Sequence, residues 1–326
     1  MCLSHSTKFY NPYGQKKTND ISYEQFIKFL NRYKNALSVS LIGNGEPLLN
    51  KDFFKMIAYS SNKMNMKVCS SSNGILVKKF TNEIIESNLL HLNISINGHN
   101  SSEFHRLTGN SPELFEIICN NVKYLIQQKK QRNAKLKVAA TFILDQLNFK
   151  YLKEMITLAD NLGVDEIVFF QFLPVDIKGY TAKERCLYLD NMEVVPVFDQ
   201  INTFPKKIRK KVTLPPLLER DMKNNKFCCT PFFNISINGK ENIGGCCCQL
   251  LNFENNGSFS DKNAWNNEHF NDLRRRFLYS NSPLFEPCTW CYNNSRDNRN
   301  RNFFRYNLIS IINDILSCLR SDKDME

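Results

Sequence analysis

The chain has 326 residues, of which 43 are Lys or Arg, 32 are Asp or Glu and 12 are Cys, and its formal net charge is +11 at pH 7. Its length suggests about two domains. Its hydrophobic and charged contents of 42% and 23% exclude a largely disordered, collagen-like or coiled-coil protein. A chain this long buries most of its apolar surface without covalent cross-links, so the cysteines require another explanation.

The sequence favours a cytoplasmic protein. No apolar run reaches the ~20 residues that a membrane-spanning helix needs, and Met1–Ser6 lacks the charged and apolar regions of a signal peptide. In the reducing cytoplasm, cysteines are more often metal ligands or catalytic groups than disulfides. The basic residues are spread along the chain and are not interleaved with aromatic residues, which disfavours nucleic acid as a partner, and nothing indicates a membrane.

Helices and strands alternate over the first half of the chain. Apolar residues at helical spacing predict a helix over Ser22–Tyr33, followed by a strand over Leu37–Ile42. Further helices are predicted over Asp52–Tyr59, Phe80–Leu90, Pro112–Gln128 and Tyr151–Leu162, and strands over Met66–Ser70, His91–Ile96, Leu136–Leu144 and Glu166–Phe172. This alternation indicates βαβ units with a parallel sheet, in an open or partly closed barrel whose working face lies at the carboxyl ends of the strands.

The alternation stops after Pro174, which divides the chain into four segments. Residues 1–174 form the predicted barrel, and 175–226 are predicted to be a linker with short helices. Residues 227–295 form a second unit that holds seven of the cysteines. Residues 296–326 are a basic segment that ends in an amphipathic helix over Phe303–Leu319.

The cysteines of the second unit have the spacing of metal ligands. Cys288 and Cys291 form a CxxC pair, and the runs Cys228-Cys229 and Cys246–Cys248 lie upstream. One ligand from each run together with the pair gives four thiolates, the ligand set of a [4Fe–4S] cluster and equally of a structural zinc site. The other cysteines interrupt apolar patterns and are predicted to be small core residues: Cys69, Cys119, Cys186 and Cys318.

Polar, glycine-containing segments follow three of the predicted strands. The first is Gly43–Leu49, in which Gly43 and Gly45 allow a ligand to approach the backbone and Glu46 can accept a hydrogen bond from an amine. The alternative for this segment alone is an ordinary βα turn. Ser71–Gly74 and Ser95–Gly98 follow the next two strands, at the same edge of the sheet.

These segments resemble motifs of radical S-adenosylmethionine (radical SAM) enzymes. Gly43–Leu49 is similar to the GGE motif of that family, Ser71–Gly74 to its TNG segment, and Ile94–Gly98 to its serine-bearing fourth strand. Residues 227–292 resemble the SPASM/twitch extension, which carries auxiliary clusters. The matching pieces are Cys228–Phe232, Asn238-Gly239, Cys246-Cys247, Ala264–Asn266, Leu273-Arg274 and Cys288–Cys291.

The resemblance implies a fold and a set of site residues. The fold would be a partial (β/α)6 radical SAM barrel without its first strand, followed by a small cysteine-rich domain. Gly45 and Glu46 would bind the amino group of SAM, Ser95 and Arg106 its carboxylate and ribose, and Asn73 would line the same pocket. The alternatives are an ordinary strand-end serine at Ser95 and a solvated charge at the start of a helix at Arg106.

The family's CxxxCxxC motif is represented only by its end. Cys2 would be the third ligand of the [4Fe–4S] cluster at the SAM site, and the other two would precede the first residue of the sequence. Either the sequence begins at an internal Met, or the gene is degenerate and its product lacks that cluster. Without a first strand, the strand over Leu37–Ile42 would expose an unpaired edge that favours aggregation.

The resemblance therefore implies a radical SAM enzyme. Its SAM-site cluster and SAM would generate a 5′-deoxyadenosyl radical that abstracts hydrogen from a peptide or small-molecule substrate, with electrons from a donor such as a flavodoxin or ferredoxin. The predicted metal ligands are Cys2 at the SAM site and Cys228, Cys246, Cys288 and Cys291 at one auxiliary [4Fe–4S] cluster, with Cys229 and Cys247 as alternates. The alternative is an inactive iron–sulfur or zinc protein. A third possibility, RNA modification, is suggested only by the charge.

Overall fold

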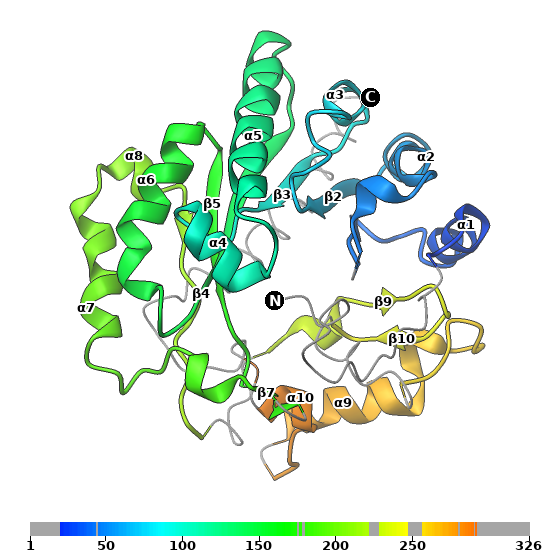
Figure 1. Ribbon diagram of the computed structural model, residues 1–326. Coiled ribbons are helices and arrows are strands. Elements are labelled where there is room, and N and C mark those ends of the chain that lie inside the picture. Colours follow the sequence, from blue (N-terminus) through cyan, green and yellow to red (C-terminus); the bar gives the residue numbers. More distant parts are fainter. Residues whose placement is uncertain are drawn as a thin grey trace.

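A computed structural model describes the chain over residues 20–43, 45–174, 176–177, 180–221, 228–246, 256–279, 281–289 and 291. Its centre is one sheet of six parallel strands (Figure 1). In sheet order these are β1 (Ser38–Leu41), β2 (Lys67–Ser72), β3 (His91–Ser95), β4 (Lys137–Leu144), β5 (Glu166–Gln171) and β8 (Val212–Thr213). The first five agree with the predicted strands to within two residues at each end, which confirms the α/β class.

Helices connect the strands and cover the outside of the sheet (Figure 1). Five lie where helices were predicted: α1 (Tyr23–Arg32), α2 (Phe53–Ala58), α3 (Thr81–Glu86), α5 (Glu113–Gln131) and α6 (Leu152–Leu162). The helix predicted over Phe80–Leu90 is shorter, because α3 ends at Glu86. None of the helices in the described ranges has the length and apolar content needed to cross a bilayer.

Local sequence signals explain where several helices begin and end. Ser22 and Gln25 form a capping box at the start of α1, each side chain accepting a hydrogen bond from the backbone N–H of the other. Gly163 ends α6 in the left-handed conformation, with φ +78°. One helix was not predicted: α4 (Ser101–Thr108) is capped by Asn100, whose Oδ1 accepts the N–H of Glu103 at 2.8 Å.

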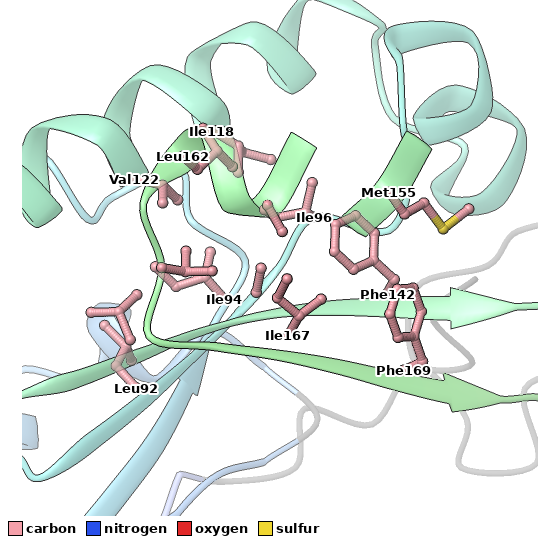
Figure 2. Packing of buried hydrophobic residues seen from close by; sticks show 14 of the residues in the cluster. Leu92, Ile94, Ile96, Ile118, Val122, Phe142, Met155, Leu162, Ile167 and Phe169 are labelled. Atoms are coloured by element: carbon pink, nitrogen blue, oxygen red, sulfur yellow. The ribbon is translucent and has the colours of Figure 1, made fainter. Parts of the chain in front are cut away.

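The main core lies between the sheet and its outer helices. Figure 2 shows side chains of β3, β4 and β5 meeting those of α5 and α6. The labelled residues of this cluster are Leu92, Ile94, Ile96, Phe142, Ile167 and Phe169 on the sheet side, and Ile118, Val122, Met155 and Leu162 on the helix side. The rings of Phe142 and Phe169 stack with centroids 5.3 Å apart. This packing fixes the strands whose carboxyl ends carry the candidate site.

The segment predicted as a linker contributes to this core. Its short elements are β6 (Asp176–Ile177), β7 (Tyr180–Thr181), α7 (Val194–Asp199), α8 (Lys206–Arg209) and β8, with a 3-10 turn, η4, over Lys183–Arg185. Strand β8 pairs in parallel with β5, and Leu187, Phe198 and Leu217 are buried in the main core. The sheet thus extends beyond the predicted boundary at residue 174, because a two-residue strand is too short to produce a recognisable pattern.

The cysteine-rich unit is a small hairpin followed by helices. Its elements are β9 (Ser236–Ile237), β10 (Ile243–Gly244), α9 (Glu268–Leu278) and α10 (Glu286–Thr289), with 3-10 turns η6 (Thr230–Phe232) and η8 (Ala264–Asn266). Strands β9 and β10 pair antiparallel. The helix predicted over Phe303–Leu319 lies outside the described residues.

The cysteine-rich unit packs against α1, at the β1 edge of the sheet (Figure 1). Phe26, Phe29 and Leu30 of α1 share a buried cluster with residues of this unit, namely Ile243, Phe259, Ala264 and Phe270. The Arg32 guanidinium lies 5.1 Å from the Phe259 ring and donates hydrogen bonds to the carbonyls of Phe259, Asp261 and Lys262. Strand β1 is an edge of the sheet, as predicted, and two of its side chains, Val39 and Leu41, pack against both clusters.

Candidate functional site

Glu46 joins the loops that follow β1 and β2. Its Oε2 accepts a hydrogen bond from the backbone N–H of Asn73 at 2.7 Å, and its Oε1 accepts from the N–H of Leu48 at 3.3 Å. The second bond caps the 3-10 turn η1 (Pro47–Leu49). Glu46 and Asn73, which the sequence assigned to one pocket, are therefore in direct contact at the carboxyl edge of the sheet.

Two glycines of these loops have opposite surroundings. A Cβ added to Gly45 would meet no atom of the described residues within 4 Å, so none of them keeps a small ligand from the backbone there. Gly74 has φ +82°, and a Cβ there would lie 2.8 Å from Cγ2 of Ile118. The fold therefore requires a glycine at position 74, whereas the described residues around position 45 leave room for a side chain.

The buried side-chain amide of Asn121 stabilises the turn after β2. Asn121 on α5 donates hydrogen bonds to the carbonyls of Gly74 at 3.0 Å and Ile75 at 2.9 Å, and the Asn73 side chain accepts from the N–H of Ile75 at 3.0 Å. These bonds leave the Asn73 side chain exposed at the edge of the sheet. Sequence reasoning missed Asn121, which has no distinguishing pattern within its helix.

Ser95 is the last residue of β3 and pairs in register with Thr141 of β4. It is half-buried, and no hydrogen-bond partner of its hydroxyl lies among the described residues. The neighbouring serine Ser70 differs, because its hydroxyl donates to the carbonyl of Leu41 at 2.6 Å. Ser95 therefore has a hydroxyl available at the same edge as Glu46 and Asn73.

Arg106 lies near the end of α4 and is paired with two carboxylates. Its Nε donates to Glu103 at 2.8 Å and its Nη2 to the same carboxylate at 2.5 Å, while Nη1 and Nη2 donate to Asp145 at 3.1 and 3.0 Å. The hydrogen bonds to Glu103 and then Asp145 raise the pKa of Arg106 above its ordinary value, against the effect of burial. The alternative of a solvated charge at a helix start is wrong, because the side chain is only 30% exposed.

Asp145 is a site residue that the sequence analysis missed. It follows β4 directly, its side chain is fully buried, and it accepts hydrogen bonds from Arg106, Arg185 and the backbone N–H groups of Leu147 and Asn148. A carboxylate immediately after an apolar strand was the available signal. No direct contact joins this network to Ser95, Glu46 or Asn73 among the described interactions.

The cysteine-rich unit brings four predicted ligands into one neighbourhood. Cys288 and Cys291 are 8% and 7% exposed. Burial raises the pKa of Cys288 above its ordinary value, and the nearby thiols of Cys246, Cys291 and Cys228 raise it further. Burial likewise raises the pKa of Cys228 to about 12. These thiols are close enough to interact electrostatically, and a positive metal centre would relieve the cost of ionising them.

The described residues do not form a compact single-ion site. Within the described ranges, no three Cys, His, Asp or Glu side chains are arranged to hold one metal ion. In a [4Fe–4S] cluster each thiolate binds a different iron, so its ligands lie further apart than those around one zinc ion. The set of Cys228, Cys246, Cys288 and Cys291 has the number of thiolates that either a [4Fe–4S] cluster or a zinc ion takes. Cys2 and Cys247 lie outside the described residues.

The four cysteines that were predicted to be core residues differ in burial. Cys119 and Cys186 are buried, which agrees with their prediction as small core residues, and burial raises the pKa of Cys119 to about 11. Cys69 is half-buried in β2. Cys318 lies outside the described part of the chain.

Sequence comparison finds relatives of the barrel half. The profile of the Radical SAM superfamily matches residues 2–169, about half of the chain. A probable GTP 3′,8-cyclase of Saccharolobus islandicus is 25% identical over 174 residues, which are 53% of this chain and 53% of the relative. The GTP 3′,8-cyclase of Vibrio atlanticus is 26% identical over 136 residues, 38% of this chain and 41% of that protein. The chain spans about half the length or less of these curated relatives.

Solved structures share the fold over a larger part of the chain. Streptococcus suis SuiB bound to S-adenosylmethionine has a TM-score of 0.57 and 16% identity, covering 76% of this chain and 60% of that chain. Native anSMEcpe with bound AdoMet and the Kp18Cys peptide has a TM-score of 0.57 and 12% identity, covering 85% of this chain and 82% of that chain. At these identities the likeness shows the fold alone.

Proposed function

The chain belongs to the radical SAM superfamily, and on that premise we propose that it is an enzyme that removes a hydrogen atom from a peptide or another small molecule. When bound, a [4Fe–4S] cluster and SAM supply the reactive 5′-deoxyadenosyl radical, while the protein binds, orients and shields the reactants. Cys2 would be one ligand of that cluster. The reductant would be a small electron carrier such as a flavodoxin or ferredoxin.

The contact between Glu46 and Asn73 carries this proposal. The Glu46 carboxylate fixes the loop after β1 against the turn after β2 with a 2.7 Å hydrogen bond, and none of the described residues keeps a ligand from the backbone at Gly45. A fixed loop with exposed backbone suits the amino group of SAM, which donates hydrogen bonds to backbone carbonyl oxygens. The hydroxyl of Ser95 on the adjoining strand, which has no partner among the described residues, suits the carboxylate of SAM.

Arg106 has a more limited role in this proposal. Four of its five N–H donors are occupied by Glu103 and Asp145, so its guanidinium cannot form a bidentate pair with a ligand carboxylate. It would act on SAM through its charge and its remaining Nη1 donor. Arg106 is thus expected to orient and attract the ligand more than to bind it tightly.

We extend the proposal to an auxiliary [4Fe–4S] cluster of SPASM type. Its ligands would be Cys228, Cys246, Cys288 and Cys291, whose thiols interact electrostatically; Cys288 and Cys291 are buried, and Cys228 and Cys246 are partly buried. Burial favours neutral thiols, so binding of iron would release protons and stabilise the surrounding unit. A peptide is our preferred substrate, because the solved structures with TM-scores of 0.57 and 0.56 include complexes described as bound to peptides.

The test is SAM binding, after anaerobic reconstitution with iron and sulfide, by a protein that carries all three cysteines of the CxxxCxxC motif, with Cys2 as the third. We expect more than four irons and no zinc per chain, a change in the electron paramagnetic resonance spectrum of the reduced protein on addition of SAM, and formation of 5′-deoxyadenosine. A protein that holds iron without binding SAM would overturn the enzymatic proposal. A protein that holds zinc would overturn the auxiliary cluster.

A further inference from the structure

Arg185 lies where two strands of the sheet end. It is the last residue of the η4 turn, in the segment that follows β5. Its guanidinium contacts Asp145, the first residue after β4, and lies 4.3 Å from the ring of Phe172, the first residue after β5. Arg185 is therefore at the carboxyl edge of the sheet, the same edge that carries Glu46, Asn73 and Ser95.

The orientation of Arg185 is fixed by several contacts. Its Nε donates to Oδ2 of Asp145 at 3.1 Å, and its Nη2 donates to the same oxygen. The backbone is also held, because the carbonyl of Arg185 accepts the N–H of Gln146 at 3.2 Å and the carbonyl of Cys186 accepts Nε2 of Gln146 at 2.6 Å. A guanidinium stacked on an aromatic ring and held by a carboxylate loses little conformational entropy when it binds a ligand.

The charges around Arg185 are not balanced evenly. Arg106 and Arg185 share the single carboxylate of Asp145, but Arg106 also has Glu103. Arg185 has no second carboxylate within the described part of the chain, and its Nη1 donates to none of the described residues. Its side chain is 23% exposed. Arg185 is therefore an oriented cation that the described residues neutralise only in part, and three of its five N–H donors have no acceptor among them.

We propose that Arg185 binds an anionic oxygen group of the substrate, a carboxylate or a phosphate, through its free Nη1. This inference rests on the proposed function, because it assumes that the carboxyl edge of the sheet holds the reacting molecules. Guanidinium groups pair with both oxyanions, in charge-assisted bonds that are about twice as strong as neutral ones. The substrate would then be anchored near β5 while SAM lies across the ends of β1 to β3.

The test is the binding of small anionic probes to the intact chain. The probes are an acetylated triglutamate amide, inorganic pyrophosphate and a neutral triglutamine amide, each titrated by isothermal calorimetry. The proteins are the wild type, Arg185→Gln, Arg185→Lys and Arg132→Gln. Arg132 lies at the exposed end of α5 and pairs with Glu86, so its loss changes the net charge equally at a distant place.

We expect one anionic probe to bind saturably to the wild type and the neutral peptide not to bind. The dissociation constant should rise about tenfold in Arg185→Gln, which is the loss of one charge-assisted hydrogen bond, and should not change in Arg132→Gln. Arg185→Lys should lie between them, because it keeps the charge and loses the planar fork. The stronger of the two anionic probes identifies a carboxylate or a phosphate.

Two results would overturn the proposal: no saturable binding of either anionic probe, or equal affinities in the wild type and Arg185→Gln. If Arg185→Gln does not fold, the comparison of Arg185→Lys with Arg132→Gln decides the question. SAM binding is measured on the same proteins. A wild type that fails to bind SAM contradicts the proposed function, whereas SAM binding with probe affinities independent of Arg185 contradicts only this inference.

Discussion

The Glu46 carboxylate accepts the backbone N–H of Asn73, a residue 27 positions later in the chain, at 2.7 Å. This one bond ties together two loops that belong to consecutive βα units. The positions of the loops are therefore coupled, and a change at Glu46 reaches the turn after β2.

Replacing Glu46 by Gln should weaken SAM binding more than it weakens folding. A Gln side chain keeps one acceptor oxygen and cannot accept at both Leu48 and Asn73, so one of the two bonds is lost. We expect a SAM dissociation constant about tenfold higher, measured by equilibrium dialysis, and a loss of about 1 kcal/mol or less in unfolding free energy. Glu83→Gln, an exposed carboxylate on α3, is the control. Equal effects of the two substitutions would contradict the assigned role.

The two glycines of the site should respond oppositely to alanine. Gly74→Ala forces a residue with a Cβ into φ +82° and against Ile118 at 2.8 Å, which should cost about 2–4 kcal/mol in urea unfolding. The new Cβ of Gly45→Ala meets no atom of the described residues within 4 Å, so the stability of this variant should be unchanged while its SAM binding weakens. A stable Gly74→Ala protein, or normal SAM binding by Gly45→Ala, would refute the respective assignment.

Removing the charge of Asp145 should destabilise the barrel. Asp145→Asn leaves Arg106 with one carboxylate and Arg185 with none in the described part of the chain, and both guanidiniums are largely buried. Breaking a buried pair from one side costs about 3–5 kcal/mol, measurable by urea unfolding. Asp190→Asn, which breaks the exposed pair with Arg220, should change stability little. Similar losses of unfolding free energy in the two variants would show that the ion pairs of Asp145 do not stabilise the barrel more than an exposed pair does.

Acid should remove a contribution of Glu166 to stability. The hydrogen bond from His91 at 3.1 Å lowers the pKa of Glu166 below its ordinary value of 4.5, with further help from Lys137 and against the effect of burial. Because the folded-state pKa is the lower one, the contribution is complete above pH 4.5 and is lost as the pH falls through the folded-state value. The difference in unfolding free energy between the wild type and Glu166→Gln should therefore shrink on acidification. A difference that is constant with pH would exclude this linkage.

Loss of the CxxC thiols should remove the auxiliary metal. In Cys288→Ala/Cys291→Ala we expect about four fewer irons per chain by elemental analysis after reconstitution, together with lower stability of the cysteine-rich unit. Cys119→Ala is the matched control, because that thiol is buried in the main core. It should lower stability without changing the iron content. Unchanged iron in the double variant would refute the ligand assignment.

The sequence predicted the regular part of the fold well. Buried parallel strands give long apolar runs, and β4, which is buried along most of its length, was found with nearly correct bounds. Helix α4 was missed because only Glu103, Phe104 and Leu107 are buried in it, too few to produce a clear apolar period. Strand β8 was missed because two residues show no alternation.

The candidate-site residues that the sequence pointed to lie mainly in family-like motifs at the ends of strands. The resemblance to radical SAM motifs assigned Glu46 and Asn73 to one pocket, and the Glu46 carboxylate contacts the backbone N–H of Asn73. The pairing of Arg106 with Asp145, and of Asp145 with Arg185, depends on how α4 and the segment after β5 fold back over the sheet. Such contacts between distant parts of the chain leave no periodic trace in a single sequence.

The packing of α1 has a consequence for the boundary predicted at residue 227. One face of this helix, with Phe26, Phe29 and Leu30, is buried by the cysteine-rich unit, and Arg32 is held by carbonyls of the same unit. A barrel expressed alone would expose this apolar face beside the edge strand β1. The two units are therefore separate in sequence but should melt together, so any metal that the cysteine-rich unit binds should also raise the melting temperature of the barrel.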